Sequence, residues 1–168
     1  MIHIFGQLEA EDLPALLTLQ EQVFEKLENP DLLRRNSPER LTWCLEAPNI
    51  ALGFFDEGGL AAAGILVEPA EGETDLRKGL VRHQRADRAA DLKLILVRPD
   101  RRGEGLQMQL MGELETRALA AGYGQLCVSV APDNLYSRRN ILAAGYTPDH
   151  TECLYGGLLR EVLVKDLS

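Results

Sequence analysis

A short glycine turn between two apolar segments is the part of this sequence best suited to chemistry. Residues 92–97 are apolar except for Lys93, and Arg101-Arg102-Gly103-Glu104-Gly105 follows them closely. From Leu106 onward an apolar residue recurs at every fourth position, which predicts an amphipathic helix that ends before Gly122. A strand that feeds a glycine turn at a helix start presents free N–H groups and a positive dipole end at one point. The sequence therefore predicts an anion site here, with phosphate as the natural ligand.

The turn fits neither of two common phosphate-binding motifs. The third glycine of a dinucleotide fingerprint would fall on Met108, and no Gly-Lys-Ser/Thr follows the turn as in a P-loop. Five arginines gather around the turn and a later helix start: Arg98, Arg101, Arg102, Arg138 and Arg139. They either hold a phosphorylated ligand or form a solvated face.

Composition sets limits on the class of protein. The chain has 168 residues, 45% of them hydrophobic, and a net charge of -8, which predicts a single domain, residues 1–168, and argues against a nucleic-acid partner. The acidity favours a cationic partner such as an amine. There is no apolar run of membrane-spanning length and no basic, apolar start, so we expect no membrane partner and a cytoplasmic location. The three cysteines read as reduced thiols, and no cluster has metal-ligand spacing, so no metal is expected.

The elements that must position the turn follow from the apolar spacing. The predicted order is β-α-α-β-β-β-α-β-α-β-β, an α/β (α+β) fold with a mixed, mainly antiparallel sheet and helices on both faces. We expect strands at 1–5, 50–55, 60–67, 92–97 and 125–130, and two last strands around Leu154 and over 158–167. Helices are expected at 13–27, 38–46, 106–121 and 135–144. The polar segment 69–91 is either a lid or partly helical.

Two sequence blocks in this order resemble the GNAT-type N-acetyltransferases. The first block of that family is a strand ending in Val followed by R/Q-x-x-G-x-G/A at a helix start, and residues 102–107 read Arg-Gly-Glu-Gly-Leu-Gln. The second block is a strand, an Asn, and a helix ending in Gly plus an aromatic residue, matched here by residues 126–130, Asn134 and Gly145-Tyr146. Gln107 departs from the small residue that the family has at the sixth motif position.

The resemblance implies acetyl-CoA as cosubstrate and assigns residues to it. The pyrophosphate falls to the turn and helix start: Arg102, Gly103, Glu104, Gly105, Leu106 and Gln107. The Glu104 side chain must then point away to solvent. The pantetheine arm falls to the strand backbone at Ile95, Leu96 and Val97, with the Val97 N–H as oxyanion donor. Asn134 would bond the arm, serve as a helix N-cap, or do both, and Ser137 lies on the same helix face.

Proton transfer is where the sequence departs from the family. The position of the usual catalytic Tyr, seven residues after the Asn, is Ile141. Tyr136 points about 160° away on the helix, so packing is its expected role. Tyr155 and His150 lie near the last strands, which border the acceptor site in this family, and are the catalytic candidates. Glu68 is either a proton acceptor through water or an exposed strand end.

Two functions of different classes follow. The first is transfer of an acetyl group from acetyl-CoA to a primary amine of a small molecule or peptide, by direct attack in a ternary complex. The alternative, suggested by Ile141 and Gln107, is a non-catalytic module that binds or senses acyl-CoA. Arg34 and Arg35 either bind an acidic part of a substrate or form a solvated face. By analogy with the family, a homodimer is also expected.

Overall fold

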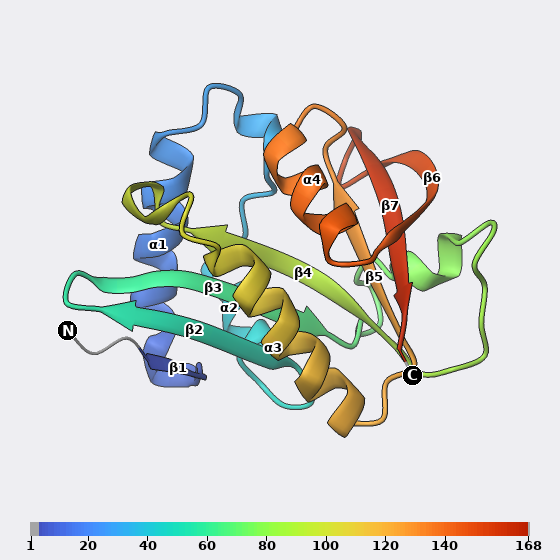
Figure 1. Cartoon of the computed structure of the whole chain (residues 1–168), viewed down its shortest axis with the longest axis horizontal. Helices are drawn as coiled ribbons and strands as arrows, with labels where there is room; N and C mark the ends of the chain where they lie inside the picture. The colour runs from blue at the N-terminus through green and yellow to red at the C-terminus, as the bar shows by residue number, and fades with distance from the viewer. Residues whose placement is uncertain (1–3, 168) are drawn as a thin grey trace.

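A computed structural model describes residues 4–167 of the chain (Figure 1). One seven-stranded sheet runs through it in the order β1-β2-β3-β4-β5-β7-β6. Only β4 and β5 pair in parallel, and every other neighbouring pair is antiparallel. The mixed, mainly antiparallel sheet and the order of elements predicted from the sequence are confirmed.

The first half of the chain forms one side of the molecule. Strand β1 (Ile4–Gln7) pairs with β2 (Ile50–Asp56), which turns into β3 (Gly59–Val67). Helices α1 (Leu13–Glu25) and α2 (Pro38–Cys44) cover one face of these strands. Ser37 caps α2 through its hydroxyl, which accepts a hydrogen bond from the Arg40 N–H, and Pro38 fills the first helical position.

The second half supplies the other layer. Strand β4 (Ala89–Val97) leads into α3 (Leu106–Ala120), and β5 (Gln125–Val130) leads into α4 (Leu135–Ala143). The apolar side of α3 (Leu106, Leu110, Leu114 and Ala118) packs on the opposite sheet face from α1. Figure 1 shows α3 lying across the sheet in front with α1 behind it. Strands β6 (Thr147–Leu154) and β7 (Leu158–Asp166) complete the sheet.

Three boundaries differ from the sequence prediction. Strand β4 begins at Ala89 rather than at 92, because Asp91 is buried within it despite its charge. Strand β6 begins at Thr147, and its alternating exposed and buried residues hide it from a search for apolar runs. The expected first strand extends over Ile4–Gln7, and residues 1–3 lie outside the described part of the chain.

The polar segment between β3 and β4 is mostly irregular and contains one short 3-10 helix, Leu76–Gly79. Leu76 and Leu80 pack on Cys127, Val162 and Val164, so this segment covers the sheet face of β5 and β7 that α3 and α4 leave open. No helix within residues 4–167 is long and apolar enough to cross a membrane.

Candidate functional site

The two parallel strands separate in the middle of the sheet. Strands β4 and β5 pair only from Ala89 to Leu92 and from Gln125 to Val128. Beyond this, β4 continues beside β3, and β5 continues beside β7. A register shift leaves Lys93 as an extra residue of β4, a bulge at the point where the strands part. Figure 1 shows the two strands diverging. Pockets lie where they separate, and we call these pockets together the splay cleft.

The splay cleft consists of three adjoining spaces. The central cavity lies between the strands and is lined by Lys93, Ile95, Val130, Ile141, Tyr155 and Arg160 among others. On one side, the loop-side groove includes Val97, Arg102 and Tyr136. On the other, the arginine-side groove includes Arg34, Arg35, Arg40 and Tyr155. Shared lining residues join the spaces: Gln107 and Asn134 on the loop side, Arg34 and Tyr155 on the arginine side.

The glycine turn has the geometry expected of an anion site. Gly103 and Gly105 have φ of +82° and +79°, in the left-handed region that glycine adopts freely. A Cβ at either position would meet no atom within 4 Å, so the turn is open on that side. Among the described residues, no side chain caps the start of α3, which leaves its first N–H groups free for a ligand. The Glu104 carboxylate turns away from that point and pairs with Arg101 at 3.0 Å.

The arginine cluster is a correction to the sequence interpretation. Arg98 is buried and pairs with Asp56 at 2.5 Å and with Asp100. It therefore stabilises the fold and does not bind a phosphorylated ligand. Arg101 also pairs with Asp56, and Arg138 pairs with Glu161. Of the five arginines, Arg102 and Arg139 have no ion pair among the described residues, and Arg102 lines the loop-side groove.

Gln107 lies between two helices rather than across the turn. It is buried, its amide nitrogen lies 3.5 Å from the Ser137 hydroxyl, and its oxygen accepts a hydrogen bond from Asn140 at 3.2 Å. Both partners belong to α4, so the side chain ties the start of α3 to α4. Gln107 leaves the glycine turn open and forms part of the cleft wall instead.

Strand β4 offers an unpaired backbone edge to the cleft. The Arg98 N–H donates to the Ala61 carbonyl of β3 at 2.7 Å. Because N–H directions alternate along an antiparallel strand, the N–H groups of Val97 and Ile95 point away from β3 and into the cleft. Leu96 contributes its side chain to the cleft wall and its N–H to the β3 ladder. An extended, amide-containing arm would find two free donors here.

The second motif also reaches the cleft. The Asn134 side-chain oxygen accepts a hydrogen bond from the Ser137 N–H at 3.3 Å, so the predicted N-cap is present. Asn134 and Ser137 both line the central cavity and the loop-side groove. Ile141 is 2% exposed and lines the central cavity, so no proton donor occupies its place. Tyr136, for which packing is the expected role, is half exposed and lines the loop-side groove.

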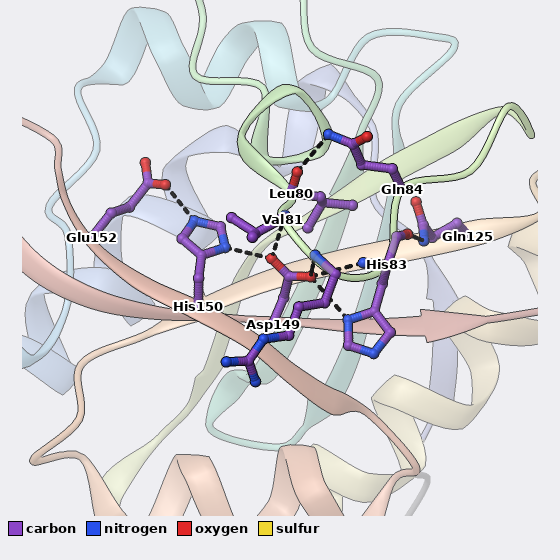
Figure 2. Close-up of polar contacts among 9 residues, drawn as sticks. Leu80, Val81, His83, Gln84, Gln125, Asp149, His150 and Glu152 are labelled. Atoms are coloured by element: carbon purple, nitrogen blue, oxygen red, sulfur yellow. Dashed lines mark hydrogen bonds and ion pairs between the residues drawn. The ribbon is translucent and has the colours of Figure 1, made fainter.

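The structure separates the two catalytic candidates. Tyr155 lines the central cavity, and its hydroxyl lies 2.9 Å from that of Ser129. Burial raises the pKa of the Tyr155 phenol, so the group is a neutral proton donor near pH 7. His150 lies elsewhere: Figure 2 shows it between Asp149 and Glu152, and it lines a separate depression with Val81.

Glu68 does not reach the cleft either. Its carboxylate accepts two hydrogen bonds from Arg88 and one from Tyr123. Neither Glu68 nor His150 lines the splay cleft, so we do not assign proton transfer to either of them.

Sequence reasoning missed two charged residues of the cleft. Lys93 and Arg160 stand in strands that read as apolar runs, and in each case the lone charge within the run was the available signal. The side chain of Lys93 is only 6% exposed, and burial lowers the pKa of its ammonium group in spite of Glu73 at 3.8 Å. Arg160 is 4% exposed as a residue and also lines the central cavity.

Comparison with solved structures identifies the fold. The ribosomal-protein-S18-alanine N-acetyltransferase from Escherichia coli superposes with a TM-score of 0.74 at 17% identity, covering 99% of this chain and 95% of that one. A putative acetyltransferase from Salmonella typhimurium, solved with its cofactor acetyl-CoA, gives 0.73 at 15%, covering 100% and 95%. The ribosomal-protein-alanine N-acetyltransferase from Brucella melitensis gives 0.71 at 20%, covering 98% and 99%. No protein-family model and no curated protein matches the sequence.

These likenesses cover the whole length of the chain. The protein therefore has the fold of the GNAT-type N-acetyltransferases, as the two sequence motifs indicated. The separation of β4 and β5, the open glycine turn and the free edge of β4 are the features of this fold that form its splay cleft here.

Proposed function

We propose that the protein transfers an acetyl group from acetyl-CoA to a primary amine by direct attack within the splay cleft. The observation that carries the proposal is the continuity of the cleft, which runs from the uncapped start of α3, past the free N–H groups of β4, to the arginine-side groove. A donor held on one side and an acceptor held on the other meet in the central cavity without leaving it.

The residues on the loop side fit acetyl-CoA. The N–H groups from Gly103 to Gln107 and the unpaired guanidinium of Arg102 suit a pyrophosphate. The free β4 edge and Asn134 suit the amide-containing arm. The thioester of acetyl-CoA supplies the activated acetyl group. The Val97 N–H faces the cleft, where it would stabilise negative charge on the thioester oxygen, an effect worth about 2.7–4 kcal/mol per donor.

Two side chains in the central cavity suit the proton transfers. The acceptor amine must lose a proton to attack, and the departing thiolate must gain one. Lys93, with its lowered pKa, is our candidate for accepting the first proton. Tyr155, kept neutral by burial, is our candidate for donating a proton to the thiolate. It would take over the role of the catalytic Tyr that the family has at the position of Ile141. The reaction yields an N-acetylated amine and free CoA.

A second function remains as an alternative because of one observation. Ile141 is buried and apolar where the family resemblance places the acid. A module that binds acyl-CoA without transferring the acyl group would show binding but no CoA release with any amine. Steady thiol release with even one acceptor excludes this alternative.

Binding is tested first, by the melting temperature with and without acetyl-CoA. Ligand at about 100 times its Kd adds roughly 2.7 kcal/mol of stability, a shift of about 5–10 °C for a chain of this size. Gly105→Trp should abolish the shift because the side chain fills the open turn.

A matched variant separates blocked binding from backbone strain. Gly72→Trp is the control, since Gly72 also has positive φ, at +87°, and open space around it, but lies outside the cleft. A shift retained in Gly105→Trp would remove the assigned site, and a shift lost in both variants would trace the effect to folding.

A further inference from the structure

Arg160 is a buried cation without a carboxylate partner in the described chain. Its Nη1 donates to the Leu159 carbonyl at 2.9 Å and its Nη2 to the Asp31 carbonyl at 2.7 Å. Burial lowers the pKa of the guanidinium, which shows the cost of holding this charge away from water. A buried charge normally has an opposite charge beside it. Since Arg160 lines the central cavity, an anionic ligand would supply the missing charge.

Arg34 approaches the same space from the segment between α1 and α2. Its guanidinium stacks over the Tyr155 ring at 4.2 Å, and its Nη1 is buried with no hydrogen-bond partner within residues 4–167. Arg34 lines both the central cavity and the arginine-side groove. Its neighbour Arg35 lines only the arginine-side groove and is paired with Glu21. The sequence offered the same two roles for both arginines, and the structure distinguishes them. Arg34 lines the central cavity, whereas Arg35 already has a carboxylate partner.

The charge in this half of the cleft is one-sided. The charged residues lining the two spaces are Lys93, Arg34, Arg35, Arg40 and Arg160, with Asp31 as the carboxylate among them. Glu73 lines neither space, and its carboxylate lies 3.6 Å from Arg40 and 3.8 Å from Lys93. The chain as a whole has a net charge of -8, but the charge around these two spaces is positive. An acidic protein that gathers cations around one cavity provides an electrostatic site for an anion.

We propose that the acceptor is a small amine that also carries a carboxylate, and that Arg160 and Arg34 bind the carboxylate. The proposal rests on the proposed acetyl transfer. A guanidinium binds a planar carboxylate through two parallel N–H groups, and both arginines have donors free of carboxylates. Apolar side chains also line the central cavity, among them Leu92, Leu94, Leu96, Val128 and Val130, beside uncharged polar ones such as Asn36 and Ser129. A singly charged carboxylate costs less to bring into such surroundings than a doubly charged phosphate.

The acceptor preference is tested by CoA release with matched pairs of amines. Each pair is an amino acid and its amide, such as glycine with glycinamide and alanine with alaninamide, and O-phosphoethanolamine is the phosphate arm. The amide has the less basic amino group and would react more readily on intrinsic grounds. We expect kcat/KM for the acid to be at least tenfold higher. Equal or better use of the amides, or of the phosphate compound, overturns the proposal.

Charge-removing variants assign the preference to the two arginines. Arg160→Met and Arg34→Met keep the aliphatic length, and each should bring the acid-to-amide ratio to within about threefold. Arg34→Met guards against misfolding of Arg160→Met, because Arg34 makes no hydrogen bond to the backbone among those the structure describes. Arg117→Met, on the exposed side of α3, makes the same change in net charge and should leave the ratio as in the parent. If the acid-to-amide ratio of kcat/KM is unchanged in both Arg160→Met and Arg34→Met, the two arginines do not bind the carboxylate.

A binding measurement separates this proposal from the proposed function. Glutarate has carboxylates but no amine, so it binds without reacting. Calorimetry should show glutarate binding to the parent protein at least tenfold more tightly than to Arg160→Met or Arg34→Met, with Arg117→Met unchanged. If acetyl-CoA neither binds nor turns over, the proposed acetyl transfer is wrong, and glutarate binding still tests the anion site independently. If glutarate does not bind and neutral amines are acetylated, the anion site is wrong and the acetyl transfer stands.

Discussion

The hydroxyl of Tyr155 lies 2.9 Å from the hydroxyl of Ser129, and this contact joins the turn between β6 and β7 to the part of β5 that lies beyond its pairing with β4. Tyr155 holds a φ of +53°, unusual for a residue with a side chain. Ser129 fixes the phenol in the central cavity, and the Arg34 guanidinium covers its ring. Tyr155 is thus held in the cleft by contacts from two other segments.

Replacing Tyr155 with Phe removes the proposed proton donor and leaves the ring. We expect kcat to fall about 100-fold, within the range for loss of a general acid, while the acetyl-CoA Kd changes by less than about twofold. Rapid-quench or thiol-release kinetics and calorimetry measure the two quantities. Tyr123→Phe is the control, because Tyr123 bonds with Arg88 and Glu68 outside the cleft. An unchanged kcat in Tyr155→Phe would remove Tyr155 from the mechanism.

Replacing Lys93 with Met tests the proposed base. Burial lowers the pKa of Lys93, and the Arg40 cation acts in the same direction, against Glu73. A base of this kind is inactive at low pH, where it is protonated, so kcat/KM of the parent should rise with pH through its pKa. The Met variant should lose about tenfold or more in kcat/KM together with that rise. A pH profile of the same shape in both proteins would contradict the assignment.

The carboxylate of Asp149, in β6, is hydrogen-bonded to the segment between β3 and β4 (Figure 2). It accepts hydrogen bonds from the N–H groups of Val81, Arg82 and His83 at 2.8–3.0 Å, and it contacts the His83 and His150 rings. Burial would raise its pKa, but these donors outweigh burial and lower it. Asp149→Asn should cost about 3 kcal/mol, a fall in melting temperature of roughly 6–12 °C. Glu152→Gln, at a half-buried carboxylate, should cost less than about 1 kcal/mol.

The same cluster makes stability depend on pH through His150. Burial disfavours its charged form, but hydrogen bonds to Asp149 and Glu152 outweigh burial and raise the pKa of His150 above 6.5. A raised pKa stabilises the fold fully below about pH 6.5, and the gain is lost as pH rises through the folded-state pKa. Melting temperatures of the parent should therefore fall over this interval, and His150→Asn should flatten the curve. A parallel fall in His150→Asn would assign the dependence to another group.

The sequence predicted those parts of the site that depend on local signals. The turn at Gly103 and Gly105, the start of α3 and the Asn134 cap each follow from residues adjacent in the chain, and the structure has all three. The partners of charged residues could not be predicted in this way. Arg98 pairs with Asp56, 42 positions away, so its exclusion from the phosphate site depends on the β2–β3 turn meeting the end of β4.

The charges within apolar strands were the harder part. Lys93 and Arg160 interrupt apolar runs, and the sequence alone does not say whether such a charge faces solvent, an ion pair or a cavity. The answer depends on the bulge at Lys93 and on the separation of β4 and β5, both of which are properties of strand pairing. Gln107 is similar, because its partners on α4 are about thirty positions away.

Asp91 provides a final prediction with the opposite sign to Asp149. It is buried in β4 and accepts one hydrogen bond from the Leu76 N–H at 3.1 Å, and burial raises its pKa to about 7. The unfolded chain releases this proton near pH 4, so the folded state is progressively destabilised as pH rises from about 4 to 7. Asp91→Asn keeps an oxygen for Leu76 and removes the charge, so it should add on the order of 4 kcal/mol at pH 8 and almost nothing at pH 4. Denaturant unfolding at both values measures the difference, and a loss of stability at pH 8 would show that the charged carboxylate stabilises the fold.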